Sequence, residues 1–110
     1  MKLPEELKNR IIKALKPIDP YRVILFGSYA WGEPSRDSDI DLYIITKDDY
    51  FPKNFHEKMD LKLKVAYAID SIRNDYPVDL IVHTKPMAER FIELDSSFAR
   101  ELIQRGEKLL

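Results

Sequence analysis

Three short segments rich in β-branched and aromatic residues recur along the chain, and segments of helical character separate them. The β-forming segments are residues 21–26, 39–46 and 78–83. In the second segment Ile40, Leu42 and Ile44 alternate with other residues, so they share one face of a strand. Strands that alternate with helices favour an α/β (α+β) domain, here a small mixed β-sheet flanked by helices.

Helical periodicity and start signals predict the remaining elements. The expected helices cover residues 4–16, a short turn at 28–31, residues 54–73, a short helix from Pro86, and a last helix capped within 95–97. The stripe from Leu61 to Ile72 should be buried, as should Met87, Phe91, Leu94, Phe98, Leu102 and Ile103. Lys53, Lys58, Lys62 and Lys64 are expected on a solvated face.

Length and charge narrow the class of protein. A chain of 110 residues suits a single domain, residues 1–110, with one core. Its net charge of −1, from 18 basic and 19 acidic residues, argues against direct nucleic-acid binding. The absence of cysteine excludes disulfides and thiolate metal sites. No apolar run has the length of a membrane span, and the first ten residues lack the apolar core of a signal peptide, so a cytoplasmic protein without membrane association is expected.

Two aspartates stand at the head of the second strand. Asp39 and Asp41 are two residues apart, so both carboxylates should point to the same side. Two adjacent negative charges are costly unless a cation lies between them. Oxygen ligands of this kind favour magnesium, which binds through a few carboxylates together with substrate phosphates.

A third aspartate, Asp79, interrupts the apolar third strand. A carboxylate in such a run needs a partner or a function. If this strand lies beside the second one, Asp79 reaches the same cations. Two magnesium ions are then expected, with Asp79 holding the second and helping to deprotonate an acceptor hydroxyl.

A Gly-Ser pair follows the first strand. Gly27 permits a sharp turn and a close approach of backbone to a ligand. Ser28 can cap a helical turn whose free N–H groups attract anions, and its hydroxyl can bond a phosphate oxygen. The pair is not a Walker A loop, because no Gly-Lys-Ser/Thr sequence follows.

Gly27 and Ser28, then ten residues, then Asp39-Ile40-Asp41 form a known signature. With it the chain resembles the DNA polymerase beta-type nucleotidyltransferase superfamily, and in length and composition its minimal members, the MNT proteins. The resemblance covers about residues 21–83 and implies the nucleotidyltransferase, polymerase beta palm-like fold. It implies that Ser28 contacts nucleotide phosphate, that Asp39 and Asp41 bind magnesium, and that Asp79 is the third catalytic carboxylate.

The resemblance also implies a substrate and a partner. Many MNT proteins are antitoxins paired with a HEPN-domain ribonuclease toxin, and such antitoxins resemble enzymes that transfer AMP from ATP to a tyrosine of the toxin. One departure concerns Trp31, since the family often has arginine between the alanine and the glycine that follow Gly-Ser-x. Arg36 is the candidate replacement for that cation.

Other interpretations of the same residues stay open. Residues 37–41 can form a solvated acidic loop, whereas an EF-hand is excluded because Leu42 stands where the glycine belongs and Asp48 where the glutamate belongs. The protein can also be a non-catalytic antitoxin that neutralises its partner by occlusion. A third possibility is nucleotidyl transfer to a small molecule or an RNA end.

Overall fold

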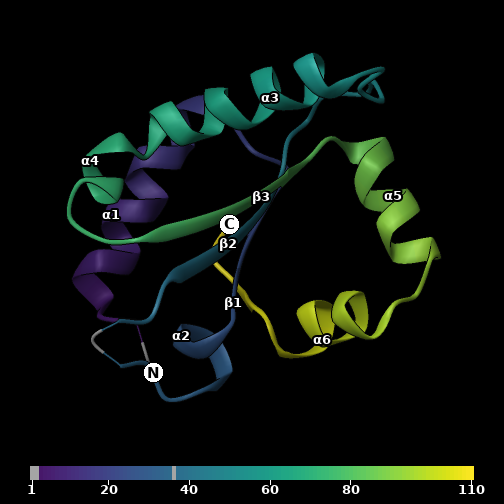
Figure 1. Ribbon diagram of the computed structural model, residues 1–110. Coiled ribbons are helices and arrows are strands. Elements are labelled where there is room, and N and C mark those ends of the chain that lie inside the picture. Colours follow the sequence, from purple (N-terminus) through teal and green to yellow (C-terminus); the bar gives the residue numbers. More distant parts are fainter. Residues whose placement is uncertain (1–2, 36) are drawn as a thin grey trace.

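A four-stranded sheet lies at the centre of the computed structural model, which describes residues 3–35 and 37–110 (Figure 1). In the order β3-β2-β1-β4, the strands are β1 (Arg22–Phe26), β2 (Ile40–Ile45), β3 (Val78–His83) and β4 (Glu107–Lys108). β1 runs antiparallel to β2 and β4, whereas β2 and β3 run parallel. The expected small mixed sheet is confirmed, and β4 is an edge strand that the sequence pattern did not predict.

Helices follow or precede each of the three longer strands. They are α1 (Glu5–Leu15), α2 (Ser28–Trp31), α3 (Phe55–Ala68), α4 (Asp70–Arg73), α5 (Lys85–Glu93) and α6 (Ser97–Arg105), with a 3-10 turn η1 (Lys16–Ile18) after α1. The helix expected over residues 54–73 is divided, because Ile69 has non-helical angles, φ −110° and ψ 22°. No helix formed by the described residues is long and apolar enough to cross a membrane.

Each face of the sheet buries its own apolar cluster. Leu42 and Ile44 of β2 point into the main core, which α1 and α3 complete. Tyr43 and Ile45 point to the opposite face and pack with residues of α5 and α6, among them Leu102. Figure 1 shows α1 and α3 together on one side of the sheet and α5 and α6 on the other. Side chains that alternate along β2 therefore serve two separate layers.

Two side chains expected to face inward from the last two helices are exposed instead. Leu94 is 66% exposed and Ile103 52%, so those predictions were wrong. Phe98 is 38% exposed, but its ring packs against Phe26 of β1 with 5.6 Å between the ring centres. The short helices α5 and α6 bury mainly small residues and Leu102 against the sheet, so only a narrow row of each helix reaches the core. Apolar periodicity in the sequence identifies the apolar face of a helix, but it does not show whether the sheet covers the whole of that face.

Candidate active site

Two of the three predicted carboxylates lie side by side on adjacent strands. Asp41 is the second residue of β2 and Asp79 the second of β3, and the two are register partners in the parallel pair. Across β2, Asp41 is paired with Phe26, the last residue of β1. Paired residues of neighbouring strands point to the same face, so Asp41 and Asp79 share the face that carries Tyr43.

Asp39 lies just outside β2, two residues before Asp41. Asp39 and Asp79 are exposed and Asp41 is half-buried. Burial raises the pKa of Asp41 to about 6, and the negative charges of Asp79 and then Asp39 add to the effect. Asp41 is therefore near enough to both other carboxylates to be repelled by their charges.

Gly27 brings the Gly-Ser turn against this carboxylate group. Its φ is +75°, a region that side-chain-bearing residues rarely adopt. A Cβ added at Gly27 would overlap Oδ2 of Asp41 and lie 3.0 Å from its Cγ. The backbone of the turn thus lies directly on the Asp41 side chain, so the two halves of the predicted site are adjacent.

The helical turn α2 starts at Ser28, as the sequence indicated, but the capping residue is Gly27. The Gly27 carbonyl accepts hydrogen bonds from the N–H groups of Ala30, at 2.9 Å, and Trp31, at 3.0 Å. Ser28 is therefore the first residue of the helical turn and not its cap, which corrects the expected cap. In a helical turn the first N–H groups have no partner within the turn, so those of Ser28 and Tyr29 are suited to an external acceptor.

A cation lies over Trp31, on an element that the sequence did not suggest. The guanidinium carbon of Arg105, the last residue of α6, lies 5.1 Å from the centre of the Trp31 ring. Trp31 itself packs against Phe26, with 6.5 Å between the ring centres. Arg36, the candidate named from the sequence, lies outside the described residues. Only the three-dimensional fold brings Arg105, distant in sequence, next to α2.

The donor chemistry of the carboxylates fits magnesium. All three predicted ligands are aspartates, and a divalent cation would relieve the repulsion felt by Asp41. Within residues 3–35 and 37–110, no three His, Asp or Glu side chains are already gathered closely enough to hold one metal ion. The described residues thus offer a paired donor set, Asp41 with Asp79, flanked by Asp39.

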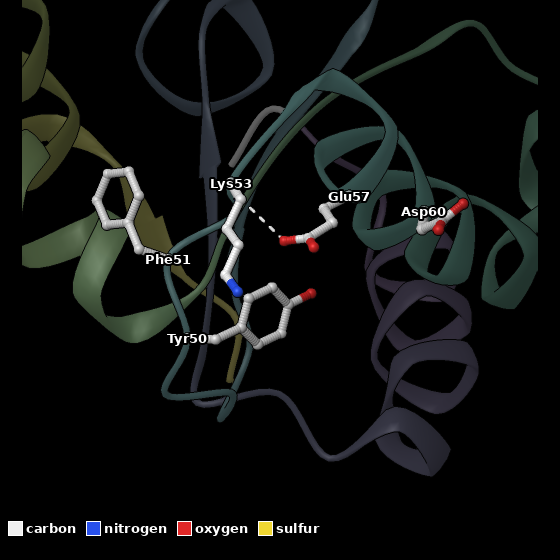
Figure 2. A pocket seen from close by; sticks show the side chains of 5 residues that line it. All are labelled: Tyr50, Phe51, Lys53, Glu57 and Asp60. Carbon is white, nitrogen blue, oxygen red and sulfur yellow. Dashed lines mark hydrogen bonds between the residues drawn. The ribbon is translucent and has the colours of Figure 1, made fainter.

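A hollow of about 330 Å³ elsewhere in the molecule is unrelated to this group. Tyr50, Phe51, Lys53, Glu57 and Asp60 line it, in and after the loop that follows β2 (Figure 2). That loop begins at the opposite end of β2 from Asp41. His83 ends β3, and its Nδ1 lies 2.8 Å from the Tyr43 hydroxyl oxygen within an aromatic cluster. Burial of the imidazole lowers the pKa of His83.

Comparisons with known proteins cover nearly the whole chain. Residues 9–109 match the family model described as polymerase beta, nucleotidyltransferase. Two Methanocaldococcus jannaschii proteins, each named as a candidate protein adenylyltransferase, are similar over 99 residues. The first is 31% identical, over 89% of this chain and 93% of its own. The second is 32% identical, over 86% of this chain and 96% of its own.

Two crystal structures are also similar. One is a mutant of the toxin–antitoxin MntA–HpeT, with a TM-score of 0.52 and 25% identity. The other is a toxin–antitoxin with AMP-PNP, with a TM-score of 0.54 and 27% identity. Each match covers 94% of this chain and 72% of the other chain.

Proposed function

This chain belongs to the polymerase beta nucleotidyltransferase family and is a nucleotidyltransferase, and from this premise we propose that it transfers AMP from ATP to a hydroxyl group of a partner toxin and acts as the antitoxin. The observation that carries the proposal is the pairing of Asp41 with Asp79 directly against Gly27. Carboxylates beside a phosphate-binding turn are what nucleotidyl transfer needs, because metal-binding and phosphate-binding groups must face one another.

The substrate and the acceptor follow from the similar proteins. Two relatives carry the name of protein adenylyltransferase, and one similar structure is a toxin–antitoxin with AMP-PNP. These names support ATP as the nucleotide and a protein as the acceptor. We assign the partner as a HEPN-domain toxin and the acceptor as a tyrosine hydroxyl of that toxin.

Each site residue has its own role in the proposed reaction. The Ser28 hydroxyl and the first N–H groups of α2 bond phosphate oxygens of ATP. Asp39, Asp41 and Asp79 would hold two magnesium ions, which when bound offset the negative charge that develops on the phosphates. Asp79 also accepts the proton of the acceptor hydroxyl. The hydroxyl oxygen bonds to the α-phosphorus, the bond from that phosphorus to the bridging oxygen breaks, and pyrophosphate leaves.

The test follows transfer of label from ATP that is labelled on its α-phosphate. The purified protein is incubated with this ATP, magnesium and the HEPN-domain protein encoded beside it. We expect label on the partner with the wild-type protein, and a loss of roughly 100-fold with Asp39→Asn or Asp41→Asn, because these carboxylates act on the developing charge. Asp75→Asn is the matched control, since Asp75 is exposed and pairs with Arg10 instead of belonging to the three-carboxylate group.

Three outcomes would count against the proposal. Neutralisation of the toxin by both Asp variants, with no label on it, would mean that the protein acts by occlusion. Label on a small molecule or an RNA end, and none on the partner, would change the acceptor class. Loss of label with Asp75→Asn to the same degree would mean that the variants act through stability.

A further inference from the structure

Helix α3 carries apolar side chains on two faces, and only one of them is buried. Leu61, Val65 and Ala66 face the core. A second set occurs at a strict four-residue spacing and is exposed: Phe55 (74%), Met59 (37%), Leu63 (38%) and Tyr67 (66%). We call these four residues the α3 outer ridge. Nothing in the packing of the described residues requires large apolar side chains on this outer face.

The loop before α3 extends the apolar surface at the start of the ridge. Tyr50 is 44% exposed and Phe51 53% exposed. In Figure 2 the side chains of Tyr50, Lys53 and Glu57 gather around the hollow, whereas Phe51 points away from them. The hollow, of about 330 Å³, takes Glu57 and Asp60 from α3 and is lined by none of the four ridge residues.

Charged side chains border the ridge unequally. Lys58 and Lys62, also four residues apart, form a parallel row on one flank, and both are exposed. Among the described residues neither of them is in an ion pair. On the other flank His56 lies 3.4 Å from Asp60, and Lys64 lies 3.7 Å from Asp48. One flank therefore has uncompensated positive charge and the other is internally paired.

We propose that the α3 outer ridge docks a helix of a partner protein that has apolar side chains at four-residue spacing and Asp or Glu side chains along one flank. Rows of side chains four residues apart pack into the grooves between such rows on a second helix, at a crossing angle of about −50° and an axial separation of about 8–10 Å. The acidic flank of the incoming helix would lie against Lys58 and Lys62, which sets its register and direction.

Two other occupants fit the charges less well. A second copy of this chain would bring the same lysine-bordered ridge, and like charges facing each other oppose association. An anionic membrane would meet Asp60 and the acidic groups around Tyr50, where burial and then the charges of Asp48, Glu57 and Asp60 raise the pKa of the phenol. The favoured occupant is therefore an acidic, apolar helix.

The docking surface is separate from the carboxylates. α3 covers the sheet face that holds Leu42 and Ile44, whereas Asp41 and Asp79 point to the opposite face. A helix bound to α3 would leave the carboxylates uncovered. The inference thus goes beyond the proposed function and does not depend on the transfer reaction.

The test uses two fluorescent stapled peptides, each of roughly 16 residues, because shorter unsupported helices are marginal in water. Both have leucine at every fourth position, and one flank carries glutamate in the first peptide and lysine in the second. Fluorescence anisotropy with the wild-type protein should show binding of the glutamate peptide at least about tenfold tighter than that of the lysine peptide. A tenfold ratio corresponds to about 1.4 kcal/mol.

Variants test whether the peptide binds at the α3 outer ridge or elsewhere on the surface. Met59→Glu with Leu63→Glu should weaken the glutamate peptide by about tenfold or more, because the new carboxylates repel its flank. Lys58→Glu with Lys62→Glu should reverse the preference between the two peptides. Ile92→Glu on α5 is the matched control, since Ile92 is equally apolar and 49% exposed on another helix, and it should change nothing.

Four results would overturn the inference. They are equal binding of both peptides, no binding of either peptide, preferential binding of the protein to phosphatidylserine vesicles, and self-association of the protein that Met59→Glu abolishes. Binding of AMP-PNP is measured in the same samples. If the wild-type protein binds the peptide but not the nucleotide, the proposed function fails and the docking inference stands. Ridge variants that lose the peptide and keep the nucleotide are folded, so their loss is specific.

Discussion

At the scale of single residues, Gly27 connects folding with the candidate site. Its positive φ and its contact with the Asp41 side chain are separate constraints, and both exclude a Cβ. The same backbone then leads into the first N–H groups of α2. A glycine here therefore serves the turn and the closeness of phosphate-binding and carboxylate groups at once.

We predict that Gly27→Ala lowers the free energy of unfolding by about 2 kcal/mol, since backbone strain of this kind costs about 1–3 kcal/mol. AMP-PNP binding should weaken as well, because the added methyl group displaces Asp41 from the turn. Urea unfolding and calorimetric titration measure the two effects. Gly32→Ala is the comparison, because Gly32 has a negative φ of −105° and only tight contacts with Ser28. Equal stability of Gly27→Ala and wild type would contradict the prediction.

At the scale of secondary-structure elements, the start of α3 determines where the outer ridge begins. The Asn54 side chain accepts a hydrogen bond from the Glu57 N–H at 2.9 Å. The Glu57 carboxylate accepts one from the Lys53 N–H, also at 2.9 Å. The two bonds satisfy N–H groups at the helix start and hold the loop before Phe55.

We predict that Asn54→Ala costs about 1 kcal/mol of stability, the usual effect of losing an N-terminal cap. Urea unfolding measures it. Asn9→Ala is the matched control, because Asn9 is exposed within α1, where alanine is the better helix former. A loss of stability at Asn9 as large as that at Asn54 would show that the cap itself contributes nothing.

Elements were predictable where a local pattern determines them. The alternation in residues 40–45 and the Asn and Ser start signals gave the positions of β2, α3 and α6, since period and capping are local properties. The break at Ile69 and the short strand β4 depend on contacts between distant segments, so the local sequence does not contain them. The same limit explains why Leu94 and Ile103 were wrongly expected inside.

The candidate site was predictable to a similar extent. The spacing of Asp39 and Asp41 places them on one side, and two adjacent apolar strands suggested that Asp79 lies beside Asp41. The contact of Gly27 with Asp41 and the position of Arg105 over Trp31 arise only when β1, β2 and α6 are assembled. The roles of these residues in transfer stay predictions until the labelling experiment is done.

At the scale of the whole molecule, Asp41 and His83 lie at opposite ends of the parallel strands β2 and β3, and their titrations have opposite effects on stability. Asp41 has a pKa near 6 in the folded protein and 3.8 as its ordinary value. Between these values the folded state holds more protons than the unfolded state, so stability falls as the pH rises. His83 has a pKa below its ordinary value of 6.5. Below pH 6.5 the unfolded state therefore holds more protons, and stability rises with pH.

The two titrations oppose each other in the wild-type protein, so the pH dependence of its stability does not isolate Asp41. The informative quantity is the difference in the free energy of unfolding between wild type and Asp41→Asn. The contribution of His83 is the same in both proteins and cancels. Asparagine stays neutral, so it avoids first the cost of burying a charge and then the repulsion from Asp79 and Asp39. We predict that Asp41→Asn gains stability relative to wild type as the pH rises from 4 to 6, and that the gain then stays constant. Its size should be about 1 kcal/mol, because solvent screens a partly exposed carboxylate. Urea unfolding in EDTA at each pH measures the difference, and a difference that does not vary with pH would mean that folding does not raise the pKa of Asp41.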